Sequence, residues 1–119
     1  MAEIGGRLVI RQGDAVAELE KLALETHAEA IFFNRDPDPF GRGVEERLEK
    51  MGARIGIAIR SFKDVAIHER DEVLTGAGDP FRVFTPYSKA WAKLPKPPIA
   101  MRISRIQSPS GIFSLPLPD

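Results

Sequence analysis

AIFFNRDPDPFGR, residues 30–42, is the stretch that decides how this chain folds. Its first four residues, Ala30–Phe33, are apolar and rich in aromatic and β-branched side chains, which favours a strand buried on both faces. Pro37 and Pro39 follow, and each fixes φ and disfavours helical geometry in the preceding residue, so we expect an extended, stiff backbone there. The polar side chains of this segment crowd the carboxyl end of the strand, where ligands bind in open α/β sheets. The simpler alternative is a polar turn with solvated charges.

The residues before this stretch predict a strand and a helix. Leu8–Ile10 is a short β-prone run, and the turn after it ends at Asp14, a favourable helix N-cap. From Ala15 the apolar residues recur at helical spacing, which predicts a helix that runs to about His27. A histidine at that end is a favourable partner for the helix dipole.

The residues after it predict a second helix and another strand. Val44–Met51 has a helical pattern and ends at Gly52, a typical residue just beyond a helix. Arg54–Ile59 alternates and then becomes apolar, which predicts a strand in which Gly56 allows close approach of another backbone. Strands that alternate with short helices indicate an α/β fold, here a partial Rossmann-like parallel sheet with flanking helices.

The C-terminal part has a different character. Two β-prone pieces, Val73–Thr75 and Phe81–Phe84, flank a Gly-rich turn and predict a small hairpin, and Thr85 with the following proline marks a helix start. Residues 95–119 hold six of the ten prolines and show little periodicity. We therefore expect a domain over residues 1–94 and an irregular Pro-rich linker or tail over 95–119.

Composition limits the classes of function. The 119 residues suffice for one domain, and 17 basic and 17 acidic residues give no net charge, unlike a nucleic-acid-binding surface. The absence of cysteine excludes a disulfide scaffold and thiolate chemistry. The sequence has no apolar run long enough to span a membrane and no signal peptide, so we expect a cytoplasmic location.

No catalytic or metal-binding pattern is evident. The only two histidines, His27 and His68, lack the spacing of metal ligands, and no serine nucleophile motif is present. Gly76 and Gly78 do not precede a helix that begins with Lys-Ser/Thr, which argues against a phosphate-binding loop.

Three stretches, in this order and spacing, resemble the N-terminal α/β domain of the DNA photolyase/cryptochrome family. The first is residues 8–14, LVIRQGD, and the second holds the residues Asn34, Asp36 and DPFGR at 38–42. The third is residues 76–87, GAGDPFRVFTPY, followed by Trp91. The resemblance covers about residues 5–95.

The resemblance implies a binding slot for an antenna chromophore. The acidic side chains would accept hydrogen bonds from the ligand, the phenyl ring would stack on it, the glycine would let it approach the backbone, and the arginine would meet an anionic group. The residues assigned to this slot are Asn34, Asp36, Asp38, Phe40, Gly41 and Arg42. A deazaflavin or flavin-like ring is favoured over a folate, because folate-binding members carry Asn-Glu where this chain has Phe40-Gly41. The alternative is that the carboxylates cap the following helix, Phe40 is core and Arg42 is solvated.

The resemblance also implies a fragment of a light-driven DNA-repair lyase. The family's first two strands would precede Glu3, and its helical domain, which holds FAD, would follow residue 119. We therefore expect this chain alone to be inactive, to bind neither nucleic acid nor membrane, and to need the missing FAD-binding domain. The family's strand order, 3-2-1-4-5, would leave bare strand edges here, so we expect a homo-oligomer that buries them.

Three other readings stay open. The chain could belong to a cryptochrome photoreceptor, since the residues that discriminate lie in the absent domain. It could instead be a non-enzymatic α/β interaction module whose edges and tail bind a partner. A nucleotide-binding module of the universal-stress or electron-transfer-flavoprotein type would require a Gly-rich phosphate loop before a helix, and no such loop is present.

Overall fold

The computed structural model describes residues 2–64 and 66–117. The chain forms two compact units, one made by residues 1–62 with 101–119 and the other by residues 63–100. The elements, in chain order, are η1 (Ala2–Ile4), α1 (Ala15–Thr26), β1 (Ala30–Asn34), α2 (Pro39–Ile55), β2 (Ala58–Phe62), η2 (Arg70–Glu72) and α3 (Phe84–Lys93).

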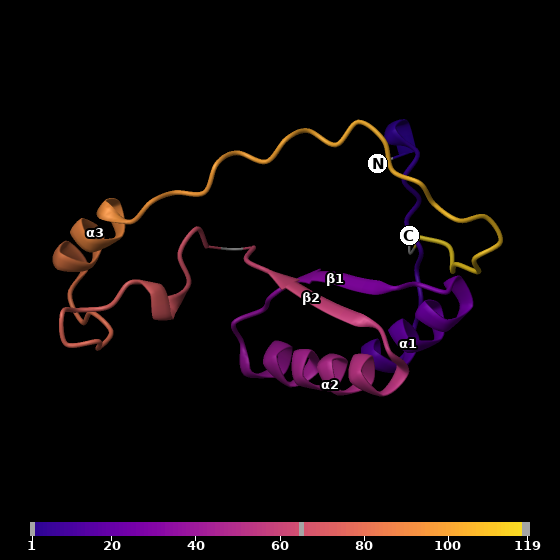
Figure 1. Cartoon of the computed structure of the whole chain (residues 1–119), viewed down its shortest axis with the longest axis horizontal. Helices are drawn as coiled ribbons and strands as arrows, with labels where there is room; N and C mark the ends of the chain where they lie inside the picture. Colours follow the sequence, from indigo (N-terminus) through magenta and orange to yellow (C-terminus); the bar gives the residue numbers. More distant parts are fainter. Residues whose placement is uncertain (1, 65, 118–119) are drawn as a thin grey trace. The chain divides into compact units, whose positions relative to one another are not determined.

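A two-stranded parallel sheet with helices on one face forms the centre of the first unit (Figure 1). Ala30 pairs with Ala58 at one end of the register, and Asn34 pairs with Phe62 at the other. The connection between the strands is α2, as a parallel pair requires a crossover. The predicted α/β class, with a parallel sheet and flanking helices, is confirmed.

The core lies between this sheet and the two helices. Val16 of α1 and Leu48 and Met51 of α2 are its buried residues. Ile31 and Phe33 of β1 pack against them, together with the other partly buried residues Leu19, Val44, Ile55 and Ile59. The helical spacing predicted from Ala15 onward therefore buries the side of α1 that was expected to face the core.

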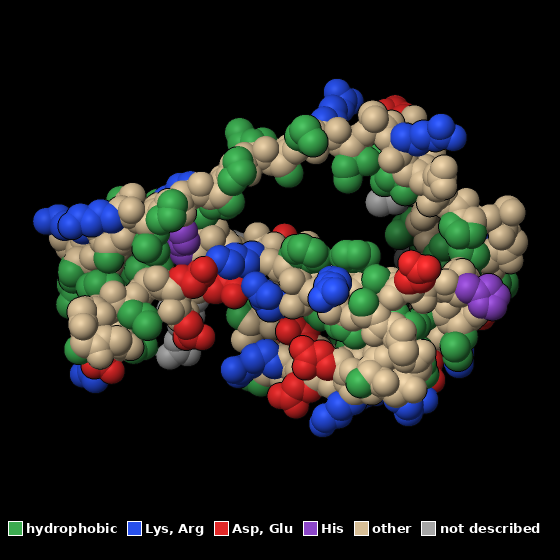
Figure 2. All heavy atoms as spheres, in the orientation of Figure 1, with side chains coloured by type: hydrophobic (Ala, Val, Ile, Leu, Met, Phe, Trp, Pro, Cys, Tyr) green, Lys and Arg blue, Asp and Glu red, His purple; other side chains and the backbone are tan. Residues whose placement is uncertain are grey.

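Only one face of β1 is covered, which corrects the prediction of a strand buried on both faces. Phe32 is 68% exposed, and Phe62 of β2 is 51% exposed on the same side. Their rings stack with centroids 6.1 Å apart and planes 19° from parallel. Figure 2 shows hydrophobic side chains uncovered along the strand pair. The apolar run was interpreted correctly as a strand, but no described helix of this unit covers its outer face.

Helix α2 is longer than the predicted helix over Val44–Met51. It begins at Pro39, because Asp38 caps it and proline is well suited to the first helical position. The backbone between Pro39 and Arg42 is therefore helical, and the prediction of an extended segment was wrong there. The helix continues through Gly52 and ends at Gly56, whose φ of 76° gives a left-handed C-cap.

The strand predicted over Arg54–Ile59 is displaced along the chain. Its first two residues belong to α2, and the strand itself is β2. Gly56 is a cap, and the close approach occurs at Gly52 instead. A Cβ atom there would lie 2.5 Å from Cγ1 of Ile59 and 2.8 Å from the carbonyl oxygen of Ile57. Helix α2 thus packs on β2 through a position that has no side chain.

Leu8–Ile10 is not a strand of the sheet, which corrects another prediction. This segment instead runs beside the C-terminal tail. The Ile106 amide donates to Ile4 O at 2.6 Å, and the Leu115 amide donates to Ile10 O at 2.9 Å. The tail is irregular from residue 95 to 109, as the prolines indicate. The domain boundary expected after residue 94 stays a prediction.

In the described part of the second unit, the 3-10 helix η2, a turn and helix α3 follow one another, and the predicted hairpin does not form. The only bridge described here is an isolated antiparallel one between Leu74 and Pro80, the residue before the second predicted β piece. The Thr75 amide donates to Asp79 O at 2.8 Å, and the Gly78 amide donates back to Thr75 O at 2.9 Å. Helix α3 begins at Phe84, one residue before the predicted start at Thr85.

Candidate functional site

The ends of the two strands are joined beyond the sheet register. The Arg35 amide donates to Phe62 O at 2.8 Å, which continues the parallel ladder by one residue. The guanidinium Nη1 of Arg35 donates to the hydroxyl of Ser61 at 3.1 Å. Sequence reasoning assigned no role to Arg35, and its place directly after the strand was the only available signal. This residue fixes where the loop leaves the sheet.

The loop that follows folds back onto the start of α2. The Asp38 amide donates to Oδ1 of Asp36 at 3.1 Å, an Asx turn of the kind that aspartate favours. The Asp36 amide donates to Oε1 of Glu45 at 3.0 Å, which ties the turn to the second turn of the helix. The loop is therefore held by its own polar groups, although it is exposed to solvent.

Asp38 is the N-cap of α2. Its Oδ1 accepts a hydrogen bond from the Gly41 amide at 2.6 Å, and its carbonyl oxygen accepts one from the Arg42 amide at 3.1 Å. Such a cap satisfies an amide that has no partner within the helix. The alternative interpretation of the two carboxylates as local helix-capping groups is thus part of this structure.

Gly41 is required by the packing of the loop itself. A Cβ atom at this position would clash with Cβ of Asp36 and lie 3.1 Å from the Asp36 carbonyl oxygen. Any larger residue would displace the Asx turn. The structure therefore supplies a reason for glycine that does not involve a ligand, and the predicted role of Gly41 in admitting a ring stays a prediction.

The remaining predicted site residues are exposed at this end of the sheet. Phe40 lies in the first turn of α2 and is 80% exposed, so it is not part of the core. Arg42 and Asn34 are exposed as well, and Asn34 ends β1. The six predicted residues lie on one segment, which runs from the end of β1 through a short loop into the first turn of α2.

The side chains of residues 34–42 suit a ligand that has hydroxyl groups and a flat ring. Asp36 and Asp38 each use Oδ1 in a local hydrogen bond, and neither Oδ2 has a partner among the described residues. Phe40 offers a free aromatic face, and the guanidinium of Arg42 is exposed. Two carboxylate oxygens, an aromatic ring and a cation within one loop suit hydrogen bonding, stacking and charge pairing with one ligand.

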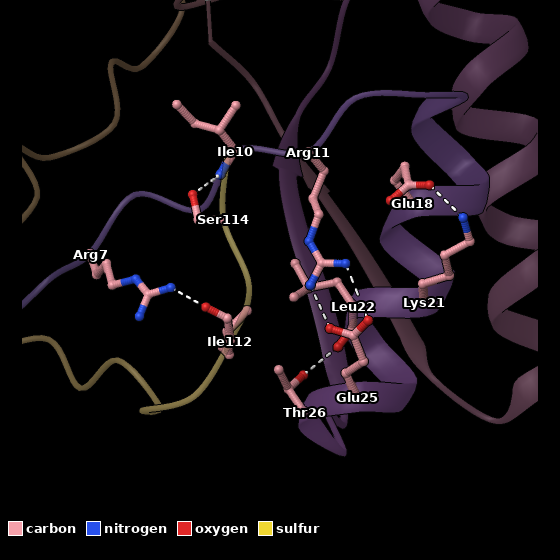
Figure 3. A network of polar contacts seen from close by, with 10 residues as sticks. All are labelled: Arg7, Ile10, Arg11, Glu18, Lys21, Leu22, Glu25, Thr26, Ile112 and Ser114. Atoms are coloured by element: carbon pink, nitrogen blue, oxygen red, sulfur yellow. Dashed lines mark hydrogen bonds and ion pairs between the residues drawn. The ribbon is translucent and has the colours of Figure 1, made fainter. Parts of the chain in front are cut away.

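A second polar network ties the N-terminal segment to α1 and to the tail (Figure 3). Arg11 donates to both carboxylate oxygens of Glu25, at 3.2 and 2.5 Å. The hydrogen bond from Arg11 lowers the pKa of the Glu25 carboxyl below its ordinary value and raises the pKa of the guanidinium. The Ile10 amide donates to the hydroxyl of Ser114 at 2.9 Å, and the Arg7 guanidinium donates to Ile112 O.

The contacts of this network stabilise the N-terminal segment and do not form a catalytic arrangement. Ser114 and Ser108 use their hydroxyls as acceptors for backbone amides, the latter for Arg7 at 2.9 Å. Sequence reasoning missed these contacts because they join residues about one hundred positions apart. No group of three His, Cys, Asp or Glu side chains within residues 2–64 and 66–117 is placed to hold a metal ion. None of the helices described is long and apolar enough to cross a membrane.

Comparison with known proteins gives a consistent result. The family model for DNA photolyase matches residues 1–104. A deoxyribodipyrimidine photo-lyase from Synechococcus is 34% identical over 99 residues, which cover 82% of this chain and 20% of that protein. A crystal structure of a class III photolyase from Agrobacterium tumefaciens superposes with a TM-score of 0.82 at 33% identity. That match covers 92% of this chain and 23% of the other.

The chain is also similar to a cryptochrome. Cryptochrome-1 from Arabidopsis thaliana is 33% identical over 88 residues, which cover 74% of this chain and 13% of that protein. The chain thus spans about a fifth of the length of the photo-lyases it matches, and less of the cryptochrome.

Proposed function

Because this chain belongs to the DNA photolyase family, we propose that it forms the antenna-binding α/β part of a light-driven DNA-repair protein. The observation that carries the proposal is the loop at residues 34–42. It gathers hydrogen-bond acceptors, an exposed aromatic ring and a cation beside the carboxyl ends of two parallel strands. The carboxyl ends of parallel strands are where α/β sheets bind ligands.

We propose a deazaflavin or flavin-like ring as the ligand of this loop. When bound, such a chromophore absorbs light and passes the excitation to the flavin of the catalytic domain. The protein supplies only binding and orientation, so no acid, base or nucleophile is needed here. In this proposal the Oδ2 atoms of Asp36 and Asp38, whose Oδ1 atoms are used within the chain, accept hydrogen bonds from the ribityl chain or ring N–H groups, and the exposed Phe40 stacks on the ring.

The first experiment is a fluorescence titration of the chain with riboflavin, a deazaflavin and a folate in parallel. Saturable quenching by a flavin-like ring, stronger than that by the folate, is expected. Absence of saturable binding by both flavin-like rings would refute the assignment of the loop. It would leave membership of the family untouched, since the family rests on the sequence match.

The second experiment tests whether Phe40 contacts the flavin-like ring. Phe40→Ala should weaken binding of the flavin-like ring by about 5- to 150-fold, since stacking on one aromatic side chain contributes roughly 1–3 kcal/mol. Phe84→Ala is the matched control, because Phe84 is also largely exposed, at 77%, and also begins a helix. Alanine has the higher helix propensity, so neither variant should lose its helix. Equal affinity of the Phe40→Ala variant and the unaltered chain would show that the ring binds elsewhere.

The catalytic activity resides, in this proposal, in a helical FAD-binding domain of the full-length protein. This chain alone is then expected neither to repair pyrimidine dimers in light nor to bind DNA, in keeping with its zero net charge. The similarity to cryptochrome-1 supports a second candidate, a photoreceptor that signals without repair. Illumination of the full-length protein with dimer-containing DNA separates the two, because only the first repairs the lesion.

A further inference from the structure

The loop between β1 and α2 is fixed at its start by two backbone amides. The Arg35 amide donates to Phe62 O at 2.8 Å, and the Asp36 amide donates to Oε1 of Glu45 at 3.0 Å. The first bond joins the loop to β2, and the second joins it to the second turn of α2. The loop therefore has one anchor on the sheet and one on the helix that follows it (Figure 1).

Prolines reduce the number of backbone donors in this loop. Pro37 and Pro39 have no amide hydrogen, so only Asp36 and Asp38 can donate from the backbone of residues 36–39. The Asp38 amide donates to Oδ1 of Asp36, which belongs to the same loop. Among residues 36–39, the Asp36 amide is thus the backbone donor that bonds outside the loop, and Glu45 is its acceptor.

The conformation of both aspartates follows from these contacts. Glu45 holds the backbone of Asp36, and Oδ1 of Asp36 in turn accepts from the Asp38 amide at 3.1 Å. Oδ1 of Asp38 accepts from the Gly41 amide at 2.6 Å. Three carboxylates therefore form a continuous series of contacts from the second turn of α2, through the loop, to the first turn. Without Glu45, Asp38 would keep its role as helix cap, but the Asp36 amide would lose its acceptor.

We propose that Glu45 is a positioning residue for the chromophore site of residues 34–42. In this proposal Glu45 does not touch the ligand. Its half-buried carboxylate holds Asp36 in the conformation in which Oδ2 accepts a hydrogen bond from the ligand, so less conformational entropy is lost on binding. The role rests on the proposed function, because it concerns the ligand of the same loop.

The contact with Asp36 requires an acceptor oxygen and does not require a negative charge. The donor is a neutral backbone amide, and glutamine carries a carbonyl oxygen on a side chain of the same length as that of Glu45. Alanine has no side-chain acceptor. If Glu45 instead acted through its charge, substitution by glutamine and by alanine would have the same effect.

A titration of matched variants with the flavin-like ring tests the effect on binding. Glu45→Ala should weaken binding by roughly 2- to 10-fold, the equivalent of one intramolecular hydrogen bond, and Glu45→Gln should retain the affinity of the unaltered chain. Glu46→Ala is the matched control, because Glu46 is the next residue of the helix, is exposed and has no hydrogen bond or ion pair with a described residue. Alanine favours the helix in both variants, so α2 should persist. Equal affinity of Glu45→Ala and the unaltered chain, or equal weakening by Glu45→Gln and Glu45→Ala, would overturn the proposal.

Amide hydrogen exchange followed by NMR distinguishes positioning from direct contact with the ligand. In the ligand-free chain the Asp36 amide should exchange roughly 2- to 10-fold faster in Glu45→Ala, since it loses one hydrogen bond, whereas the Arg35 amide, which bonds to β2, should be unchanged. Weaker binding of the ring without faster exchange at Asp36 would mean that Glu45 contacts the ring itself, which contradicts the positioning role.

The exchange measurement also separates this inference from the proposed function. Absence of ring binding by the unaltered chain refutes the proposed function, but the exchange rates still decide whether Glu45 holds Asp36. An Asp36 amide that exchanges equally fast in Glu45→Ala and in the unaltered chain refutes the inference, whether or not the ring binds.

Discussion

Gly52→Ala is expected to destabilise the chain, although alanine is the better helix former. The new Cβ atom would lie 2.5 Å from Cγ1 of Ile59 and 2.8 Å from the carbonyl oxygen of Ile57. The isoleucine side chain can rotate away, but the carbonyl belongs to the backbone that leads into β2. Relief of the clash therefore requires α2 and β2 to separate.

The change in the free energy of unfolding that we expect for Gly52→Ala follows from two opposed effects. Gly→Ala in a helix interior gains about 0.8–1.0 kcal/mol from helix propensity. Overpacking of a close contact costs about 1–3 kcal/mol, and the immobile carbonyl places this site in the upper part of that range. The expected net loss in the free energy of unfolding is about 1–2 kcal/mol, or roughly 3–8 °C in the melting temperature for a chain of this size.

Gly43→Ala is the matched control for this prediction. Gly43 lies in the same helix, and a Cβ atom there would meet nothing within 4 Å. The variant should therefore show the propensity gain alone, a stabilisation of about 0.5–1 kcal/mol. The two variants together separate steric contact from helix propensity, because the residue change and the helix are the same.

The assay must report on the unit that contains α2. The single tryptophan, Trp91, and the single tyrosine, Tyr87, both lie in the unit of residues 63–100. Their fluorescence therefore does not report on α2, and far-UV circular dichroism during urea or thermal unfolding is the appropriate measurement. If Gly52→Ala proves as stable as the unaltered chain, the close packing of α2 on β2 is refuted.

Three further outcomes are expected. The pKa values of Asp14 and Glu25 are lowered mainly because each carboxylate accepts a hydrogen bond from an arginine. Their contribution to stability is therefore present at neutral pH and is lost as the pH falls below about 4, and an acid titration followed by circular dichroism that stays flat to strong acid would contradict this. Glu25→Gln should change overall stability little, as for other exposed pairs, yet speed amide hydrogen exchange around Arg11; unchanged exchange would mean that the pair does not hold this segment. Asp38→Ala should cost about 1 kcal/mol of unfolding free energy through loss of the Gly41 cap, whereas Asp38→Asn should retain most of it, and equal losses in urea unfolding would argue against the cap.

The parallel sheet and its helices could be predicted because local patterns and tertiary packing agree there. The spacing that begins at Ala15 predicted α1, and the aromatic run predicted β1. The exposure of Phe32 could not be predicted in the same way. A four-residue apolar run has the same composition whether one or both faces are covered, and only the placement of α1 and α2 decides between them.

The limits of α2 depended on competing local rules. Pro39 was interpreted as a residue that keeps the backbone extended, but after an aspartate cap the same proline suits the first helical position. Gly52 and Gly56 were each compatible with a helix end. The choice between them is made by Ile59, which packs against the helix at Gly52, a contact that cannot be inferred from residues within one turn.

The N-terminal segment shows where sequence reasoning ends. Leu8–Ile10 has the composition of a strand, but in this structure the Ile10 amide donates to the hydroxyl of Ser114, and the Ile10 carbonyl oxygen accepts from the Leu115 amide. These partners lie about one hundred residues away, and a serine in a Pro-rich tail gives no local sign of such a contact. For a segment that lacks periodicity, the sequence therefore indicates the type of backbone structure but not the segment with which it forms hydrogen bonds.

The six residues of the candidate site were proposed from sequence because they lie within one short stretch, residues 34–42. Their local hydrogen bonds explain how this segment keeps its conformation while exposed. Asp36 and Asp38 each commit Oδ1 to the loop's own hydrogen bonds, and Oδ2 of each has no partner among the described residues. Ligand binding and helix capping therefore do not compete for the same oxygen atoms. A loop that is already held in place loses little further conformational entropy when it binds, so the capping groups themselves favour the binding proposed for residues 34–42.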